Sequence, residues 1–371
     1  TKTLVPNKFE KTGYTFAGWA KSKTAADSLK IAYTNCADVV STDLWEGIGK
    51  TNVFCAAWRA NNYTVTFNPN GGTVSQTSNV VTYAKAYGKL PKPTREGCGF
   101  GGWYTAASGG SEVTETNVVK TAKNHVVYAH WDANTYTVTF DKQGGEGGDS
   151  SVTATYGAVM STATMPTRAG YTFGGYYSDT NGGRTKYYDA DGSSTRKWIK
   201  AGDGELYAYW TANKYAVTFD ANGGNVASTS GSVTYAEAYG ELPTPTRTGY
   251  TFNGWYTTVS GGSRETLTST VTIAKDHTLY AHWTTNTYTV TFDANGGTVA
   301  PESKSVTYDA KYGDQPEPTL TGYDFVGWYT ADGAKVTAID VVTNAEDHVL
   351  YAHWTAKGYK VIFDANGGID S

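Results

Sequence analysis

Hydrophobic residues alternate with polar ones in a short phrase that recurs along the chain. In YTVTF, the Tyr, Val and Phe positions share one face and the two Thr positions the other, which is typical of a half-buried strand. An Asn-Gly-Gly turn follows in most copies, and its residues tolerate the positive φ of a tight hairpin. The copies begin at Tyr63, Tyr136, Tyr215, Tyr288 and Tyr359.

Two further phrases follow the first in a fixed order. GYTFNGWY carries a Gly between Phe252 and Trp255, which predicts a β-bulge that turns both rings toward the core. In LYAHW the alternation places Leu279, Ala281 and Trp283 inward. We therefore expect mostly β modules, each with about four strands around one aromatic cluster in which the repeated Trp is buried.

The spacing of the phrases divides the chain into four complete modules and an incomplete one at each end. Successive opening phrases lie 73, 79, 73 and 71 residues apart, and four residues always separate a closing Trp from the next opening Tyr. A short joint of constant length repeats one angle between modules, so it predicts an elongated, straight or gently twisted rod. The expected parts are 1–58, incomplete and with a long insert; 63–131; 136–210, with an insert; 215–283; 288–354; and 359–371, an opening strand.

Module length varies only between the second phrase and the closing Trp. This interval is 28 residues from Trp255 to Trp283, but 39 in segment 1–58 and 34 in module 136–210. The two long inserts contain Trp45 and Trp198, which lie outside the repeated Trp positions. A Trp on an inserted loop is a candidate partner contact. The alternative is that each ring folds back over its own module.

The candidate catalytic and metal-binding groups do not form a recognisable motif. The six His fall into pairs five residues apart, such as His277 and His282, and this spacing on one strand puts the rings on opposite faces. Asp189 and Asp191 resemble part of a calcium loop, but the run of carboxylates and the closing Glu are missing. Phosphate-loop, HExxH and GxSxG sequences are absent. The sequence therefore predicts that the protein is not an enzyme and has no catalytic residue, cofactor or metal site.

Three cysteines allow one disulfide within the chain. Cys36 and Cys55 both belong to segment 1–58, and we predict that they pair and close its inserted loop. The alternative interpretation is that Cys55 and Cys98 replace a Tyr on a strand as small, weakly polar residues.

Composition agrees with an extracellular, β-rich protein. The chain contains 43 Gly and 29 Tyr, and only 17% of its residues are charged, which is low for a cytosolic protein. The net charge of −4 comes without a cluster of Lys or Arg, which argues against nucleic acid and anionic membranes as partners. No apolar run reaches the ~18 residues needed to cross a bilayer, so membrane insertion is not expected.

The three phrases in this order, YTVTFDANGG, GYTFNGWYT and LYAHW, resemble the Listeria-Bacteroides repeat, the family that contains the B-repeat of internalin B. The resemblance extends over essentially the whole chain. It implies tandem β-grasp-like modules, α+β in detail with one short helix each, on secreted or cell-surface bacterial proteins that act as stalks or adhesins. The chain departs from the pattern at Cys98, at Tyr176 and at 141–145, and these departures make the modules non-identical.

Three functional classes are consistent with the repeats, and an extracellular or cell-surface location is expected for all of them. The constant joints favour a structural protein, either a cell-surface stalk or a filament subunit. Exposed aromatics such as Tyr280 and Trp45 favour an adhesin that binds a glycan or a host surface protein. The third class is the non-catalytic part of a larger enzyme.

The two incomplete modules predict a way to assemble copies of the chain. Segment 1–58 lacks an opening strand, and 359–368 is an opening strand with nothing after it. Donation of that strand to another copy would form an open head-to-tail filament by donor-strand complementation. Flanking repeats of a longer chain are the alternative partner. The expected interface residues are Tyr359, Val361 and Phe363 on the donor strand and Tyr14, Phe16 and Trp19 on the acceptor.

Overall fold

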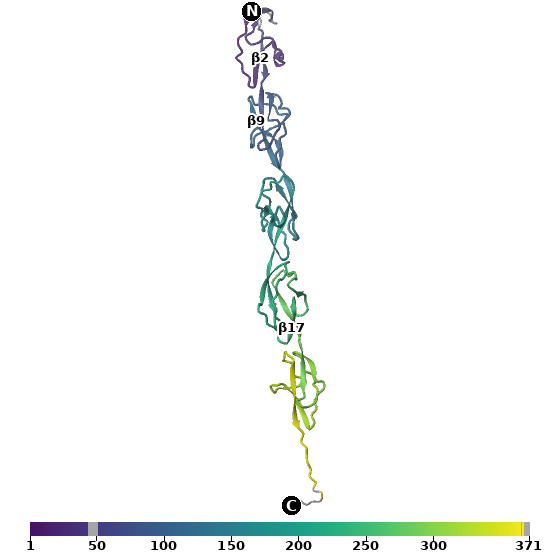
Figure 1. The fold of residues 1–371 in the computed structure, drawn as a ribbon. Helices are drawn as coiled ribbons and strands as arrows, with labels where there is room; N and C mark the ends of the chain where they lie inside the picture. Colours follow the sequence, from purple (N-terminus) through teal and green to yellow (C-terminus); the bar gives the residue numbers. More distant parts are fainter. Residues whose placement is uncertain (44–50, 365, 367–371) are drawn as a thin grey trace. The chain divides into compact units, whose positions relative to one another are not determined.

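A computed structural model describes residues 1–43, 51–364 and 366 of the chain (Figure 1). The chain divides into two compact units. The first contains Thr1–Pro166 and Phe173–Tyr209, and the second contains Thr167–Thr172 and Trp210–Ser371. Strands make up most of the secondary structure in the described residues, which confirms the mostly β fold class.

Each complete repeat forms one five-stranded mixed sheet with the same strand order, as the third module shows. Its opening strand pairs antiparallel with the second strand and parallel with the closing strand. The strand of the GYTFNGWY phrase, labelled β17 in Figure 1, pairs antiparallel with the other side of the closing strand. A short edge strand completes the sheet. The spatial order is β16 (Ser230–Thr234), β15 (Lys214–Asp220), β19 (His277–Thr285), β17 (Tyr250–Tyr256) and β18 (Arg264–Glu265).

The other three complete modules repeat this order. The first module has β6 (Ser78–Thr82), β5 (Asn62–Asn68), β9 (His125–Ala133), β7 (Cys98–Tyr104) and β8 (Glu112–Val113). The second has β11 (Ser151–Thr155), β10 (Thr135–Asp141), β14 (Gly204–Ala212), β12 (Tyr171–Tyr177) and β13 (Lys186–Tyr188). The fourth has β21 (Ser303–Thr307), β20 (Thr287–Asp293), β24 (His348–Ala356), β22 (Tyr323–Tyr329) and β23 (Lys335–Val336).

The predicted bulge is present in β17. The register against β19 shifts between Phe252 and Gly254, and Gly254 has a φ of 135°. Residues three apart on a regular strand point to opposite faces, so this shift brings Trp255 to the same side as Phe252. The indole N–H of Trp255 then donates to the carbonyl of Pro243 at 2.7 Å. This bond joins β17 to the crossover, the connection between β16 and β17.

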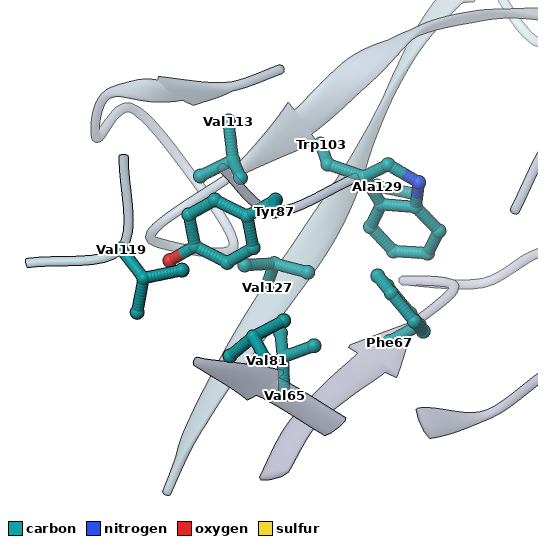
Figure 2. Packing of buried hydrophobic residues seen from close by; sticks show 9 residues of the cluster. All are labelled: Val65, Phe67, Val81, Tyr87, Trp103, Val113, Val119, Val127 and Ala129. Carbon is teal, nitrogen blue, oxygen red and sulfur yellow. The ribbon is translucent and has the colours of Figure 1, made fainter. Parts of the chain in front are cut away.

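The core of each module is an aromatic pair surrounded by small aliphatic side chains. In the first module the ring centroids of Phe67 and Trp103 lie 5.0 Å apart, and Val65 and Val127 are fully buried beside them (Figure 2). The closing Trp131 is only partly buried, because its indole lies across the Asn-Gly-Gly turn and donates to a carbonyl there. The prediction of a buried Trp is therefore confirmed for the second phrase and only in part for the third.

Two details of the modules differ from expectation. Each sheet has five strands because a two- or three-residue edge strand forms inside the variable interval, where it is too short to produce a hydrophobic period. The complete modules contain no α-helix in their described residues, although the family resemblance implied one. Their crossovers are turns and isolated bridges, such as Ala86 with Val118, and the second module has one 3-10 turn, η2 (Thr180–Gly182).

The amino-terminal segment, 1–43 and 51–60 as described, has a smaller core than the complete modules. These residues form two two-stranded sheets and a short helix, and their buried cluster consists of three Ala side chains. The buried indole N–H of Trp19 has no partner in the described residues, whereas its counterpart in each of three complete modules donates to a Pro carbonyl. The elements are β1 (Lys2–Thr3), β2 (Tyr14–Ala20), α1 (Lys23–Asp27), β3 (Asp38–Val39), η1 (Ser41–Asp43) and β4 (Cys55–Ala60).

Alkaline pH is expected to destabilise the modules through their buried tyrosines. The Tyr239 hydroxyl donates to His277 Nε2 at 2.8 Å, and burial raises the pKa of Tyr239 from near 10 to about 12. The folded state therefore holds this proton more tightly than the unfolded state. The resulting stability is complete below about pH 10 and is lost as the pH rises through about 12.

Urea unfolding followed by Trp fluorescence should show this loss, and Tyr239→Phe should make stability fall less steeply across the same pH range. At neutral pH the variant should be less stable by about 1 kcal/mol, because the hydrogen bond to His277 is lost. Tyr280→Phe, on the outward side of β19, is the matched control. An unchanged pH slope in Tyr239→Phe would contradict the argument.

Candidate functional site

The most regular arrangement outside the cores lies where one module meets the next. Gly249 has a φ of 77°, and a Cβ atom there would lie 2.3 Å from the ring of Tyr308 in the following module. Only Gly combines this backbone conformation with so close an approach. The same contact joins Gly13 to Tyr83, Gly97 to Tyr156 and Gly170 to Tyr235.

In four of the five four-residue linkers, one Asn bonds to the modules on both sides. The Asn286 N–H donates to the Gly249 carbonyl at 2.8 Å, and the Asn286 carbonyl accepts from Tyr308 N–H at 3.0 Å. Its side chain accepts from Thr251 Oγ1 at 2.6 Å and donates to Tyr288 Oη at 3.2 Å. These bonds explain why the linker keeps its length. The two backbone bonds recur at Asn61, Asn134 and Asn213.

Aromatic and cationic side chains add to three of the four joints. Tyr250 meets Tyr308 edge to face, with centroids 5.8 Å apart, and the Arg247 guanidinium lies 3.8 Å from the Tyr250 centroid. The Tyr250 hydroxyl also donates to Asp309 at 2.6 Å. Such contacts are each worth about 1 kcal/mol. Equivalent edge contacts join Tyr14 to Tyr83 and Tyr171 to Tyr235.

The joint between the first and second modules lacks the side-chain part of this arrangement. Cys98 and Gly99 occupy the positions of Tyr and Thr. A Cβ atom at Gly99 would lie 3.5 Å from Asn134 Oδ1. At the three other joints the equivalent Asn Oδ1 accepts a hydrogen bond from a Thr hydroxyl. The backbone bonds of Asn134 remain. The constant length of the linkers predicted a fixed joint but not the contacts that form it, although the recurrent Asn in the linkers could have indicated them.

Two of the three predicted acceptor residues lie together in the amino-terminal segment. Phe16 and Trp19 on β2 pack edge to face, with centroids 5.2 Å apart. Tyr14, on the same strand, instead packs against Tyr83 of the first complete module, 5.4 Å away. Tyr14 therefore belongs to a joint.

The predicted donor residues are exposed. Tyr359, Val361 and Phe363 have 76%, 70% and 91% of their surface exposed. The segment carrying them is not part of a sheet in the described residues. The head-to-tail interface stays a prediction.

The prediction of an exposed partner contact is wrong for Trp198. Only 3% of its surface is exposed, and its indole N–H donates to the Gly202 carbonyl at 3.2 Å. A Cβ atom at Gly204 would lie 2.2 Å from the indole, so the ring covers the start of the closing strand. The insert thus folds back over its own module, which was the alternative interpretation. Trp45 lies outside the described residues.

The predicted disulfide is not present in the structure. Cys36, Cys55 and Cys98 are all free thiols. Cys36 is exposed and has a φ of 59°, whereas Cys55 begins β4 and packs against the Ala cluster of its segment. The pairing of Cys36 with Cys55 is therefore unconfirmed.

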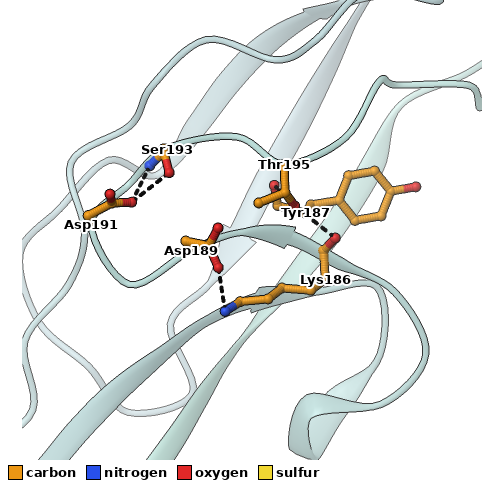
Figure 3. A network of polar contacts seen from close by, with 6 residues as sticks. All are labelled: Lys186, Tyr187, Asp189, Asp191, Ser193 and Thr195. Carbon is orange, nitrogen blue, oxygen red and sulfur yellow. Dashed lines mark hydrogen bonds and ion pairs between the residues drawn. The ribbon is translucent and has the colours of Figure 1, made fainter.

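The Asp-rich turn in the insert of the second module uses its carboxylates within the chain (Figure 3). Lys186 Nζ lies 2.6 Å from Asp189, and Asp191 accepts from both the N–H and the hydroxyl of Ser193. The bonds from Ser193 hold the pKa of Asp191 below its usual value. Within residues 1–43, 51–364 and 366, His, Cys, Asp and Glu form no group of three or more that could hold a metal ion.

The paired His residues have separate structural partners. His277 accepts from the Tyr239 hydroxyl, and its Nδ1 bonds to the Lys275 carbonyl at 3.0 Å. His282 stacks on Tyr256 with centroids 3.9 Å apart. The first and fourth modules repeat both arrangements. The two rings of a pair thus lie in different environments, as their spacing predicts.

Comparison with family models finds one match, repeated along the chain. The model of the Listeria-Bacteroides repeat domain matches residues 1–43, 63–130, 136–208, 215–282 and 288–353. The structure therefore carries this repeat in each complete module and in the amino-terminal segment.

Three relatives share long stretches with the chain. A Gly-rich protein of Evansella cellulosilytica, named as a membrane protein, is 31% identical over 372 residues, which cover 96% of this chain and 40% of the relative. A second protein named as a membrane protein from that organism is 32% identical over 315 residues, covering 82% and 46%. Internalin H of Listeria monocytogenes is 38% identical over 143 residues, covering 38% and 25%. The chain thus spans less than half the length of each.

The structure adds one finding that bears on the membrane. In the part of the chain that it describes, no helix has the length and apolar character needed to span a bilayer.

A pair of Gly substitutions can isolate the contact between modules. Gly249 and Gly240 have similar φ values of 77° and 74°, but a Cβ at Gly240 would meet nothing within 4 Å. Gly240→Ala should therefore cost only the backbone penalty of about 1–2 kcal/mol. Gly249→Ala should cost about 1–3 kcal/mol more, because its methyl group overlaps the Tyr308 ring. Urea unfolding measures both losses, and equal losses would show that the ring contact contributes nothing.

Proposed function

Because the chain belongs to the Listeria-Bacteroides repeat family, we propose that it acts as a structural stalk on the bacterial cell surface and not as an enzyme. The observation that carries this proposal is the recurrent joint. A Gly beneath a Tyr ring and an Asn bonded to both neighbours stand at each of four successive linkers. The names of the relatives, two as membrane proteins and one as an internalin, support a surface location.

A stalk needs joints that transmit the position of one module to the next. A free four-residue linker would sample many directions. Here the backbone of Asn286 bonds to Gly249 behind it and to Tyr308 ahead of it, and the ring of Tyr308 closes over Gly249. Bending such a joint would break these contacts together. The joints therefore favour a function in which reach matters.

Removing one whole repeat should shorten the molecule by the length of one module. Deletion of 215–287 joins Lys214 to Tyr288 and preserves a four-residue linker. A stalk should lose about 25–30 Å of its largest dimension, the size expected for a compact module of this length. Small-angle X-ray scattering of the purified chain and the deletion variant measures this. A change far below one module length would contradict the proposal. Surface labelling of the producing cells tests the location, and a protein that is labelled only after the cells are opened would also contradict the proposal.

We keep an adhesin as a second candidate, but not through the two inserted Trp residues. Trp198 is buried in its own module, and Trp45 lies outside the described residues. Binding of a glycan or a host surface protein would need another surface.

Strand donation between copies stays a proposal about assembly. It is supported by the orphaned indole N–H of Trp19 on the acceptor side and by the exposed apolar residues of 359–363. In the fourth module the corresponding opening strand buries Val290 and Phe292. A strand of this type could come from a flanking repeat or from another copy of the chain, and we propose the second source for a filament.

The faces of the donor strand supply a matched test. Val361 corresponds to the fully buried Val290, whereas Ile362 corresponds to the outward Thr291. Purified chain should form filaments visible by electron microscopy. Deletion of 359–371 should abolish the filaments because it removes the donor strand. Val361→Asp should also abolish them, because it puts a charge into the core of the acceptor. Ile362→Asp should preserve them, because this side chain faces outward. Filaments that survive the deletion, or a wild-type chain that stays monomeric at high concentration, would show that this route is wrong.

A further inference from the structure

A polar cleft occupies the same place in the first and third complete modules. Its volume is about 420 Å³ in the first module and about 390 Å³ in the third. Both clefts lie between the Asn-Gly-Gly turn, the Ser-Gly-Gly loop and the end of the closing strand. The shared lining is Asn70, Arg95, Ser108, His130 and Trp131 in the first, and Asn222, Arg247, Ser260, His282 and Trp283 in the third.

The Arg of the third-module cleft is held in place with most of its donors unused, whereas in the first module Arg95 donates to the Asn70 carbonyl at 3.4 Å and Cys98 stands where Tyr250 supports Arg247. In the third module the Arg247 guanidinium stacks on Tyr250, and a Cβ at Gly223 would approach it at 3.1 Å. One N–H donates to the Asn222 carbonyl at 3.1 Å. A guanidinium has five N–H donors in a planar fork, so the others remain free to bind an acceptor in the cleft.

The walls of the cleft are fixed by contacts of their own. His282 stacks on Tyr256 at 3.9 Å and bonds through Nε2 to the Thr258 carbonyl at 2.9 Å. The indole N–H of Trp283 donates to the Ala221 carbonyl, also at 2.9 Å. A ligand would therefore meet a site that is already formed, which reduces the entropy lost on binding.

Comparison among the modules shows that the Arg is not needed for folding. The fourth module forms the same sheet with Leu320 at this position. It also retains the stacked pair of Tyr329 and His353. The sheet therefore does not require the Arg, which stacks on Tyr250 at the joint and keeps other donors for binding.

The chemistry of the lining selects the class of ligand. A planar guanidinium held in position suits a carboxylate, which it can bind through two parallel hydrogen bonds. The partly exposed aromatic wall beside polar Ser and Asn groups suits a sugar ring, which has both apolar and hydroxyl-bearing faces. The chain carries no cluster of basic residues for a long polyanion. A single acidic sugar fits this pattern.

We propose that the clefts of the first and third complete modules each bind the carboxylate of an acidic sugar of the uronic-acid class. Arg95 and Arg247 provide the fork, and the His and Trp rings line the sugar. The third site binds more tightly, because Asp132 lines the first cleft and repels an anion whereas the third is lined by no acidic residue. This binding does not depend on the stalk function.

Calorimetric titration with a uronic-acid disaccharide tests the number and identity of the sites. The wild-type chain should bind two equivalents, and a neutral disaccharide of the same size none. Arg247→Leu, which copies the natural residue of the fourth module, should remove the tighter site, and Arg95→Leu the weaker one. Arg247→Lys keeps the charge but loses the fork, and it should weaken the tighter site by about tenfold or more. Circular dichroism confirms that each variant is folded.

Two controls separate a built site from general charge attraction. Arg168→Leu removes the matching Arg of the second module, whose closing strand carries Tyr209 where the cleft has His, and it should leave both sites unchanged. Asp132→Asn should strengthen the weaker site several-fold by removing the repulsion. Two sites that persist when both Arg95 and Arg247 are replaced by Leu would overturn the proposal. Equal binding of the neutral sugar, or binding of inorganic phosphate alone, would also overturn it.

Discussion

Each complete module depends on the packing of a Phe from its opening strand against the large ring of its second phrase, which is a Trp in three modules and Tyr176 in the second. In the third module the Phe219 and Trp255 centroids lie 5.1 Å apart, and the indole N–H is fixed by the crossover carbonyl of Pro243. Segment 1–58 has the Trp without the opening strand. Phe9 lies 6.3 Å from the Trp19 ring there, and the buried N–H of Trp19 has no partner in the described residues. The amino-terminal segment keeps the bulge at Gly18, so the part of this arrangement that it lacks is the Phe of the opening strand.

The parts of the fold that sequence alone predicted are those set by local geometry. Alternation in YTVTF determines which side chains face inward, and Val217 and Phe219 are buried as expected. The turn after it places Asn222 at a φ of 46°, which Asn tolerates better than most residues. The Gly before Trp255 allows the bulge because it adopts a positive φ, 135° at Gly254. Each of these features depends on a few neighbouring residues.

The features that sequence alone did not predict depend on residues far apart in the chain. Gly249 has to be Gly because of Tyr308, 59 residues later, and no local pattern joins the two. The cleft likewise combines Arg247 with His282 from another strand. Trp198 was misassigned because an insert has no repeated pattern that shows whether its ring turns inward. Tyr176 replaces the Trp of the second phrase, and its ring stacks on Phe140 with centroids 4.3 Å apart. The substitution is tolerated because the Tyr ring fills the space of the Trp.

The opening and closing strands of a module lie side by side and run in the same direction, as β15 and β19 do. The chain enters the third module at Lys214, where β15 begins, and leaves it at Thr285, where β19 ends. Tension applied to these two points would slide the strands along each other and load their hydrogen bonds together instead of one after another. The rate of forced unfolding is set by the barrier that such bonds create. This strand order therefore favours resistance of each module to a force that pulls on the two points where the chain enters and leaves it.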